Sequence, residues 1–236
     1  MPAEMTDTTT WALLLTAATV GFLHTVMGPD HYVPFIAMSR SGRWSLRRTF
    51  WVTTGCGAAH VLSSVLLGAV GIVFRVALER LTGWEALRGD WAGWMLVGFG
   101  VAYMLWGLRV AARDRHAAHH HAAGEPDEPG LAGSGAPSAA RRSAAMTGWT
   151  LFTIFVFGPC EPLIPLMMAV PSGDRWWAAT GVAGVFGAAT VGTMLLIVMA
   201  AARGLRFVRI PGLERFAHAG AGAAVAACGV AVKLGL

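Results

Sequence analysis

Apolar residues are concentrated in six long runs that are separated by short polar segments. The runs cover roughly residues 10–37, 49–74, 91–110, 147–170, 176–202 and 213–235. About 20 apolar residues are enough for a helix to cross the hydrocarbon core of a bilayer. The pattern therefore predicts an all-α, polytopic membrane protein with six transmembrane helices.

The first apolar run contains polar residues that a membrane helix would not need for packing. The stretch GFLHTVMGPDHYVPF, residues 21–35, holds two histidines, an aspartate and the Gly28-Pro29 step. Proline removes a backbone donor and clashes with the preceding turn, so it breaks or kinks a helix. Unpaired backbone groups at membrane depth are tolerated only where protein or a water-filled cavity covers them. We therefore expect this break to border a cavity.

The two halves of the chain resemble each other, which predicts an internal duplication. Three pairs of stretches match at offsets of 129–130 residues, namely GPDHYVPF (28–35) with GPCEPLIPL (158–166), GAAHV (57–61) with GAATV (187–191), and GVAYMLWGL (100–108) with GVAVKLGL (229–236). Each half then has three spans, and an odd number forces the second half to enter from the opposite side. The expected fold is two inverted three-helix repeats with broken first helices, a plan common among secondary transporters.

The duplication also sets the expected domain boundaries. Residues 1–110 form the first three-helix repeat and residues 146–236 the second. The segment 111–145 between them is rich in Ala, Gly, Pro and charged residues. Such a composition cannot bury enough apolar surface to fold. We therefore predict a disordered, His-rich cytoplasmic loop there.

The distribution of positive charge predicts the orientation in the membrane. Only 13% of the residues are charged, and the net charge is +5, whereas soluble domains average about 25% charged residues. Thirteen of the 18 Lys and Arg residues fall in 38–48, 109–145 and 203–215. Cytoplasmic loops carry the excess of Lys and Arg. We expect both termini outside the plasma membrane (the inner membrane of a bacterium), and no binding of nucleic acid.

Ionisable residues within the apolar runs are the candidate ligands of a metal ion. Such residues cost about 2.5–3.5 kcal/mol at the centre of a membrane helix, so by default they are functional candidates. Imidazole, carboxylate and thiolate groups together suit a borderline transition metal rather than Mg or Ca. The candidates are His24, Asp30, His31, His60, Cys160 and Glu161.

Structural alternatives remain open for several of these residues. His60 alone could be a packing residue, and Cys160 could be a small apolar one. Glu161 could stabilise a helix N-terminus through the dipole. Ser63 and Ser64, which follow His60, are expected to be small packing residues. Three ionisable groups within residues 24–31 have no comparable packing explanation.

A second group of histidines lies in the expected cytoplasmic loop. A short His-rich tract is typical of metal binding, and here it would capture or sense the ion rather than form the transport site. The alternative is that these histidines are ordinary polar residues of a disordered loop. The four residues are His116, His119, His120 and His121.

Three motifs resemble those of a known transporter superfamily. HTVMGPDH (24–31) resembles the first-helix signature of the nickel/cobalt transporter (NicO) superfamily, and GCGAAHVLSS (55–64) is similar to its second motif. FGPCEPLIPL (157–166) is similar to the Gly-Pro-Cys-Glu motif of the urease-accessory-protein-like branch. Five residues separate His24 from the Asp-His pair, where the best-known permeases have four and commonly eight helices.

The resemblance implies a set of ligands and an activity. It makes the two histidines and the aspartate of the first motif, together with His60, ligands along the metal pathway. Cys160 and Glu161 are added from the branch motif. The implied activity is transport of nickel or cobalt, in a direction that the motifs leave open because the superfamily includes exporters.

We therefore expect a transporter, not an enzyme, that works by alternating access between the two repeats. Nickel or cobalt is the first candidate for the transported ion, with zinc, manganese or copper as alternatives. No tightly bound cofactor is expected, and the phosphate-binding motif GxxxxGK[ST] does not occur. The expected partners are the lipid bilayer, the metal ion, and a second copy of the chain or a cytoplasmic metal chaperone.

Three other functions fit part of the pattern. The chain could export an anion or a small organic solute held at half-helix N-termini. It could be a membrane thiol-redox carrier that uses Cys160, although the repeat-equivalent residue is Asp30 and not a second cysteine. It could also be a sensor or an assembly factor that transports nothing.

Overall fold

The computed structural model describes residues 2–74, 76–121, 148–158, 160–170, 175–205 and 216–235, and these residues form helices and short connections without a strand. The first half contains α1 (Pro2–Met27), the short 3-10 helix η1 (Pro29–His31), α2 (Val33–Ser41), α3 (Leu46–Phe74) and α4 (Leu78–His121). The second half contains the helix Gly148–Phe157, then α6 (Leu163–Met168), α7 (Arg175–Gly204) and α8 (Ala217–Lys233).

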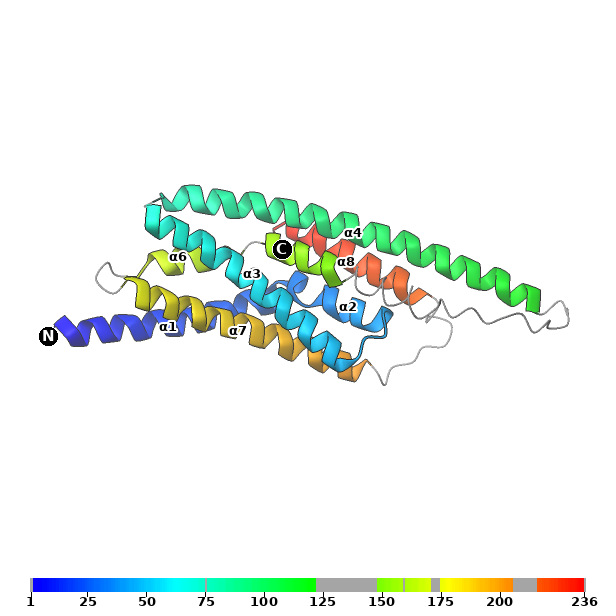
Figure 1. Cartoon of the computed structure of the whole chain (residues 1–236), viewed down its shortest axis with the longest axis horizontal. Coiled ribbons are helices and arrows are strands. Elements are labelled where there is room, and N and C mark those ends of the chain that lie inside the picture. Colours follow the sequence, from blue (N-terminus) through cyan, green and yellow to red (C-terminus); the bar gives the residue numbers. More distant parts are fainter. Residues whose placement is uncertain are drawn as a thin grey trace.

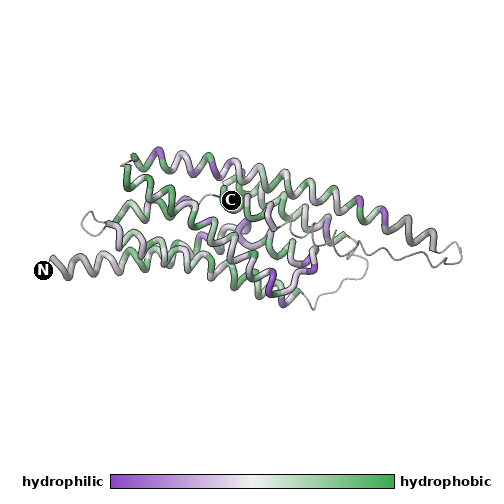
Figure 2. The backbone as a smooth tube through the Cα atoms, in the orientation of Figure 1, coloured by the Kyte–Doolittle hydropathy of each residue, from purple (hydrophilic) through white to green (hydrophobic). Residues whose placement is uncertain are grey.

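Four helices are long and apolar enough to cross a membrane. They are Thr9–Met27 of α1, α3, Leu78–Arg113 of α4, and Trp176–Gly204 of α7. The helix Gly148–Phe157 and α8 are apolar but shorter, so length and composition alone support four spans. Large apolar side chains cover the outer surface, as a lipid-facing surface requires, and the Trp177 side chain is 87% exposed. Figure 2 shows this apolar character along the length of the bundle.

The first apolar run is divided because its backbone cannot continue as one helix. The Gly28 N–H donates to the His24 carbonyl and closes α1, and Pro29 then has no N–H to donate. Two short bonds, from the His31 N–H to the Gly28 carbonyl and from the Tyr32 N–H to the Pro29 carbonyl, form η1. We call residues 28–32 the first break.

The fourth apolar run is divided in the same way. The Gly158 N–H donates to the Ile154 carbonyl and ends the preceding helix, and the chain resumes helical structure at Leu163, whose N–H donates to the Cys160 carbonyl. We call residues 158–162 the second break, within which Pro159 lies outside the described residues. Each half of the chain thus has one interrupted helix, at positions that the 130-residue offset relates.

Helix α4 is longer than the pattern of apolar residues predicts. The expected span 91–110 lies inside a helix that extends from Leu78 to His121. The polar segment 75–90, expected to connect the second and third spans, is therefore helical from Leu78, and so is the start of the expected cytoplasmic loop. Residues 122–147 lie outside the described part of the chain.

The long helices pack in pairs along one elongated bundle (Figure 1). Helix α4 lies along α8, α3 along α7, and α1 along α7. The α4–α8 contact is close because small residues face each other: a side chain at Gly100 would collide with the Ala226 backbone nitrogen, and one at Gly222 with the Met104 nitrogen. The α2–α3 connection and the C-terminal ends of α4 and α7 lie at one end of the bundle.

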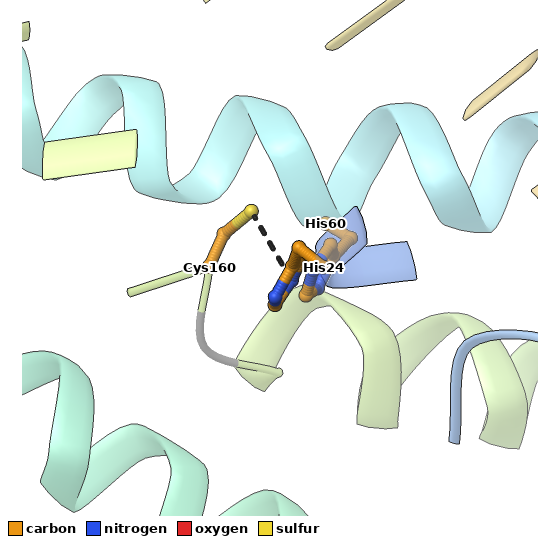
Figure 3. Close-up of side chains that lie close together, drawn as sticks. All are labelled: His24, His60 and Cys160. Atoms are coloured by element: carbon orange, nitrogen blue, oxygen red, sulfur yellow. Dashed lines mark hydrogen bonds between the residues drawn. The ribbon is translucent and has the colours of Figure 1, made fainter. Parts of the chain in front are cut away.

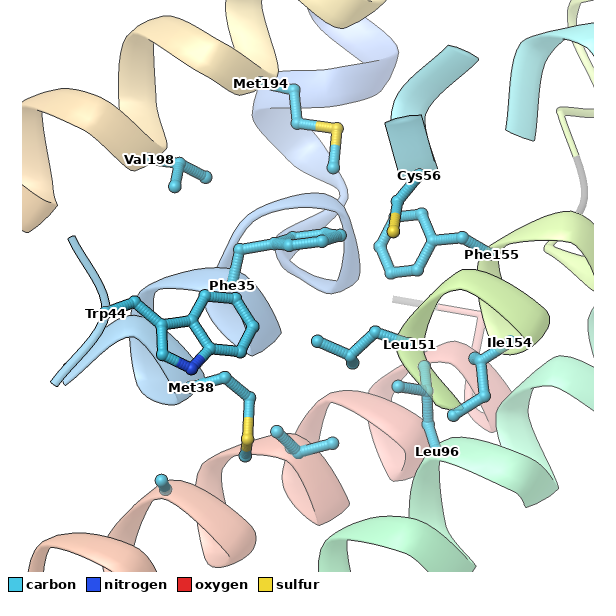
Figure 4. Close-up of a cluster of buried hydrophobic side chains, with 12 residues drawn as sticks. Phe35, Met38, Trp44, Cys56, Leu96, Leu151, Ile154, Phe155, Met194 and Val198 are labelled. Atoms are coloured by element: carbon cyan, nitrogen blue, oxygen red, sulfur yellow. The ribbon is translucent and has the colours of Figure 1, made fainter. Parts of the chain in front are cut away.

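Two buried apolar clusters flank the breaks. One surrounds Phe35 of α2, whose ring lies 4.7 Å from that of Phe155. Its other side chains come from α2, α3, α4, α7, α8, the helix Gly148–Phe157 and the α2–α3 connection, and Figure 4 shows them around Phe35. The other cluster joins α1, α3, α6 and α7 around Phe186 and includes Cys160. The breaks lie where the two clusters meet, because His60 contacts Phe155 of the first cluster and approaches Cys160 of the second.

Candidate metal centre

Three side chains from different parts of the chain meet between the two breaks. His24 is on the last turn of α1, His60 is in the middle of α3, and Cys160 lies in the second break. One donor atom from each residue lies within 4.8 Å of the others, and Figure 3 shows the three side chains converging. We call these three residues the donor group. His60 and Cys160 are buried and His24 is partly buried.

The spacing of the donor group suits a tetrahedral transition-metal ion. The His24 Nε2 and Cys160 Sγ atoms are 3.9 Å apart. Metal bonds of about 2.3 Å to sulfur and about 2.0–2.1 Å to nitrogen, at a tetrahedral angle, separate two such donors by about 3.6 Å. A cation therefore fits between His24 and Cys160 with shifts of a few tenths of an ångström. The other separations in the donor group are at most 4.8 Å, so His60 would have to approach the ion by up to about 1 Å. Two imidazoles and one sulfur are donors that favour nickel, cobalt, zinc or copper over magnesium or calcium.

His60 is held in the tautomer that a metal ligand needs. Its Nδ1 lies 3.3 Å from the Phe155 carbonyl, and since a carbonyl only accepts, Nδ1 carries the proton. The Nε2 atom then presents a lone pair. Nε2 is buried, and no described group forms a hydrogen bond with it. Histidines that bind metals usually donate their other N–H to a carbonyl or carboxylate in this way.

His31 has the same arrangement beside the donor group. Its Nδ1 lies 3.1 Å from Asp30 Oδ1 and 3.2 Å from the Gly28 carbonyl, whereas its buried Nε2 has no partner among the described residues. The His31 ring lies 4.7 Å from that of His24 and 5.1 Å from that of His60. Three imidazoles are thus stacked edge to face, and Asp30 orients the middle one.

Each break brings its glycine against an imidazole. A side chain at Gly28 would come within 2.6 Å of His31 Nδ1, and one at Gly158 within 2.9 Å of His60 Nδ1. Real Cβ atoms do not approach other atoms this closely, so either ring would have to move. The Gly-Pro steps therefore interrupt the helices, and their glycines leave room for the rings of His31 and His60.

The structure brings together some, but not all, of the candidate ligands. His24, His60 and Cys160 form the donor group, His31 lies between the two histidines, and half-buried Asp30 contacts His31. Glu161 is exposed and is not part of the donor group. His116, His119, His120 and His121 have helical backbones, and their side chains lie outside the described part of the chain. Cys56 and Cys228 are buried and form no disulfide.

Three residues around the centre were missed by the sequence analysis. Glu85 and Arg88 lie in the segment expected as a loop, and Ser63 was expected to be a packing residue. The structure joins them in one network that reaches the second break. A signal existed, because Glu85 and Arg88 are spaced by three residues within the aromatic-rich stretch WEALRGDWAGW, where an ion pair on one helix face is expected.

No protein-family model, curated protein or solved structure matches this chain. The function of the donor group is therefore inferred from its own residues and geometry.

Proposed function

We propose that the chain is a membrane transporter of a divalent transition-metal cation, with nickel and cobalt as the first candidates. The observation that carries the proposal is the donor group: two imidazoles and a thiol converge from three elements at the interruption of two apolar helices. A buried imidazole whose Nδ1 is anchored and whose Nε2 has no partner serves little purpose in packing. It serves metal binding well.

Binding of the cation would be linked to proton release. A thiol must lose its proton to become a ligand, and histidine binds a metal in its neutral form. Cys160 has no exposed surface, so its proton would leave along the route by which the ion enters. The site would then hold two neutral imidazoles and one thiolate, which together reduce the charge of a divalent cation to about one.

The packing pattern supports alternating access between two inverted repeats. Helices related by the 130-residue offset contact each other, as α3 contacts α7 and α4 contacts α8. The offset also relates α2 to α6. The contact of α2 with α8 corresponds to the contact of α6 with α4, and the contact of α2 with α7 corresponds to the contact of α6 with α3. A two-fold axis that relates the two halves produces this exchange, and three spans in each half would place that axis in the membrane plane. The six spans of this scheme include the two shorter helices.

The arginine residues support the proposed orientation. Arg40, Arg47 and Arg203 belong to the end of the bundle where α2 meets α3 and where α7 ends. The rule that positive residues stay inside places this end in the cytoplasm. The N-terminus, at the opposite end of the bundle (Figure 1), would then be outside.

Flux into proteoliposomes tests the proposal. The purified chain is expected to move Ni²⁺ or Co²⁺ in preference to Mn²⁺, with Zn²⁺ and Cu²⁺ measured alongside. His60→Ala and Cys160→Ala should reduce this flux about tenfold or more, because each removes a donor. Cys56→Ala is the matched control, since it removes a buried thiol from the apolar cluster around Phe35 and should leave flux unchanged.

Other outcomes would point elsewhere. Full metal flux in both donor variants would contradict the proposed site. Flux that anions stimulate and metals do not affect would favour an exporter of anions. Loss of function in Cys160→Ala with full function in His24→Ala and His60→Ala would favour thiol-redox chemistry.

A further inference from the structure

Glu85 and Arg88 of α4 form an ion pair that contacts the chain at the second break and is not part of the donor group. Glu85 has no exposed surface although it carries a carboxylate. Its Oε1 accepts a hydrogen bond from Arg88 Nη1 at 2.7 Å. A buried charge without a partner strongly destabilises a protein, so the two residues depend on each other. The proposed transport mechanism assigns neither of them a role.

The ion pair satisfies the backbone groups that the second break frees. Arg88 Nη2 donates to the Val156 carbonyl at 2.7 Å and reaches the Gly158 carbonyl at 3.4 Å. Glu85 Oε2 accepts the Cys160 N–H at 3.3 Å. Carbonyls on one side of the break and the amide on the other thus bind a single charged unit.

The same ion pair reaches a second member of the donor group. Arg88 Nη2 donates to Ser63 Oγ at 2.6 Å, and Ser63 Oγ donates to the His60 carbonyl at 2.7 Å. Hydrogen bonds therefore connect α4 to the Cys160 backbone through Glu85, and to the His60 backbone through Arg88 and Ser63. Two of the three donors are held relative to each other by residues that touch neither donor atom.

We infer that the Glu85–Arg88 ion pair positions the metal centre by holding the second break against α4. The inference rests on the proposed metal-binding function, and it adds that the geometry of the donor group depends on α4. Residues that orient ligands without touching the metal typically change metal affinity by about 10–100-fold when they are replaced. Glu85 and Arg88 are positioning residues in this sense.

Two measurements on purified protein test the inference. The first is the absorbance of bound Co²⁺, in which a thiolate ligand produces a charge-transfer band. The second is the rate at which N-ethylmaleimide alkylates Cys160 in metal-free protein, measured in a Cys56→Ala, Cys228→Ala background. Glu85→Gln is the main variant because it keeps the size of the side chain. Glu79→Gln is its matched control, since Glu79 is an exposed carboxylate on the same helix.

Glu85→Gln is expected to weaken Co²⁺ binding about tenfold or more and to increase the alkylation rate of Cys160 several-fold. Arg88 and the Cys160 N–H bind different oxygens of Glu85, and the replacement turns one of these oxygens into an NH2 group that only donates, so the break would open. Arg88→Lys should fall between the native protein and Glu85→Gln, because it keeps the charge but loses the planar group that reaches several acceptors. Glu79→Gln should match the native protein in both measurements.

An unchanged alkylation rate in both Glu85→Gln and Arg88→Lys would overturn the inference, whatever happens to metal binding. If the native protein binds Co²⁺ without a thiolate band, the proposed donor group is wrong, and the alkylation rates still decide whether the ion pair holds the break. The two proposals can therefore fail separately.

Discussion

The two breaks occupy equivalent positions in the two halves of the chain, yet their backbones are satisfied in different ways. In the first break, the Val26 carbonyl accepts from the Tyr32 hydroxyl at 3.3 Å, and the Gly28 carbonyl accepts from the backbone and side chain of His31. The equivalent carbonyls of the second break, those of Val156 and Gly158, accept from Arg88 of α4.

The difference follows from four letters of the sequence. The first break reads PDHY and the second PCEP, so Glu161 replaces His31 and Pro162 replaces Tyr32. Neither replacement has a side chain that donates to the preceding carbonyls: a carboxylate accepts, and proline has neither a hydroxyl nor an N–H. The second break therefore needs partners from another helix, and α4 supplies them. The hydrogen bonds of the first break therefore depend on its own residues, whereas those of the second break depend on the packing of α4 against it.

The largest expected effect is on the free energy of unfolding, which replacements at the two breaks should lower by different amounts. Arg88→Met leaves the Glu85 carboxylate buried without its partner, which should lower the free energy of unfolding by about 3–5 kcal/mol. Asp30→Asn at the first break should cost about 1 kcal/mol, because the amide oxygen can still accept from His31 Nδ1. Chemical unfolding in detergent micelles measures both values.

A double replacement provides the control for this prediction. Glu85→Met combined with Arg88→Met removes both charges, so it should be less destabilising than Arg88→Met alone. The proposed contrast between the breaks would fail if Arg88→Met and Asp30→Asn had equal effects, or if the double variant were the least stable of the three.

The next effect separates the breaks by metal affinity. Gly158→Ala pushes the His60 ring, a member of the donor group, whereas Gly28→Ala pushes the His31 ring, which lies outside it. Overpacking of this kind costs about 1–3 kcal/mol, which corresponds to about 5- to 150-fold in affinity. Co²⁺ titration should therefore show a larger loss for Gly158→Ala than for Gly28→Ala.

Gly55→Ala is the control on α3, because a side chain there would meet nothing within 4 Å. It should bind Co²⁺ as the native protein does and should be slightly more stable, since alanine favours a helix over glycine. Equal losses of affinity at Gly28 and Gly158 would mean that His31 contributes to binding as much as His60.

The sequence predicts the helical class and the positions of both breaks well, because apolar runs and Gly-Pro steps are local signals. It predicts the ends of α4 poorly. Five charged residues between Leu78 and Trp91 lower the average hydropathy of that segment, so it resembles a loop. Averages along the chain cannot show that one of these charges, on Glu85, is buried and paired.

The candidate site is predictable because each candidate ligand is an ionisable or thiol side chain within an apolar run. His24, His60 and Cys160 could be named from residue type and placement alone. Glu161 could be named in the same way, but it is exposed, because a break directs neighbouring side chains to different sides and the sequence does not give that direction. Ser63 and Ser64 show the same limit, since the sequence treats them alike.

The smallest expected effect distinguishes these two adjacent serines and so tests how far the network of the second break extends. Ser63 Oγ connects Arg88 to the His60 carbonyl, so Ser63→Ala should lower the free energy of unfolding by about 1 kcal/mol. The buried Ser64 hydroxyl has no hydrogen-bond partner among the described residues, so Ser64→Ala should leave stability unchanged or raise it slightly. The two replacements remove the same atom from consecutive positions of α3, so helix propensity and side-chain volume cancel between them. Thermal unfolding of both variants in detergent should place Ser63→Ala below Ser64→Ala. The opposite order would show that Arg88 holds the second break without the contact to α3.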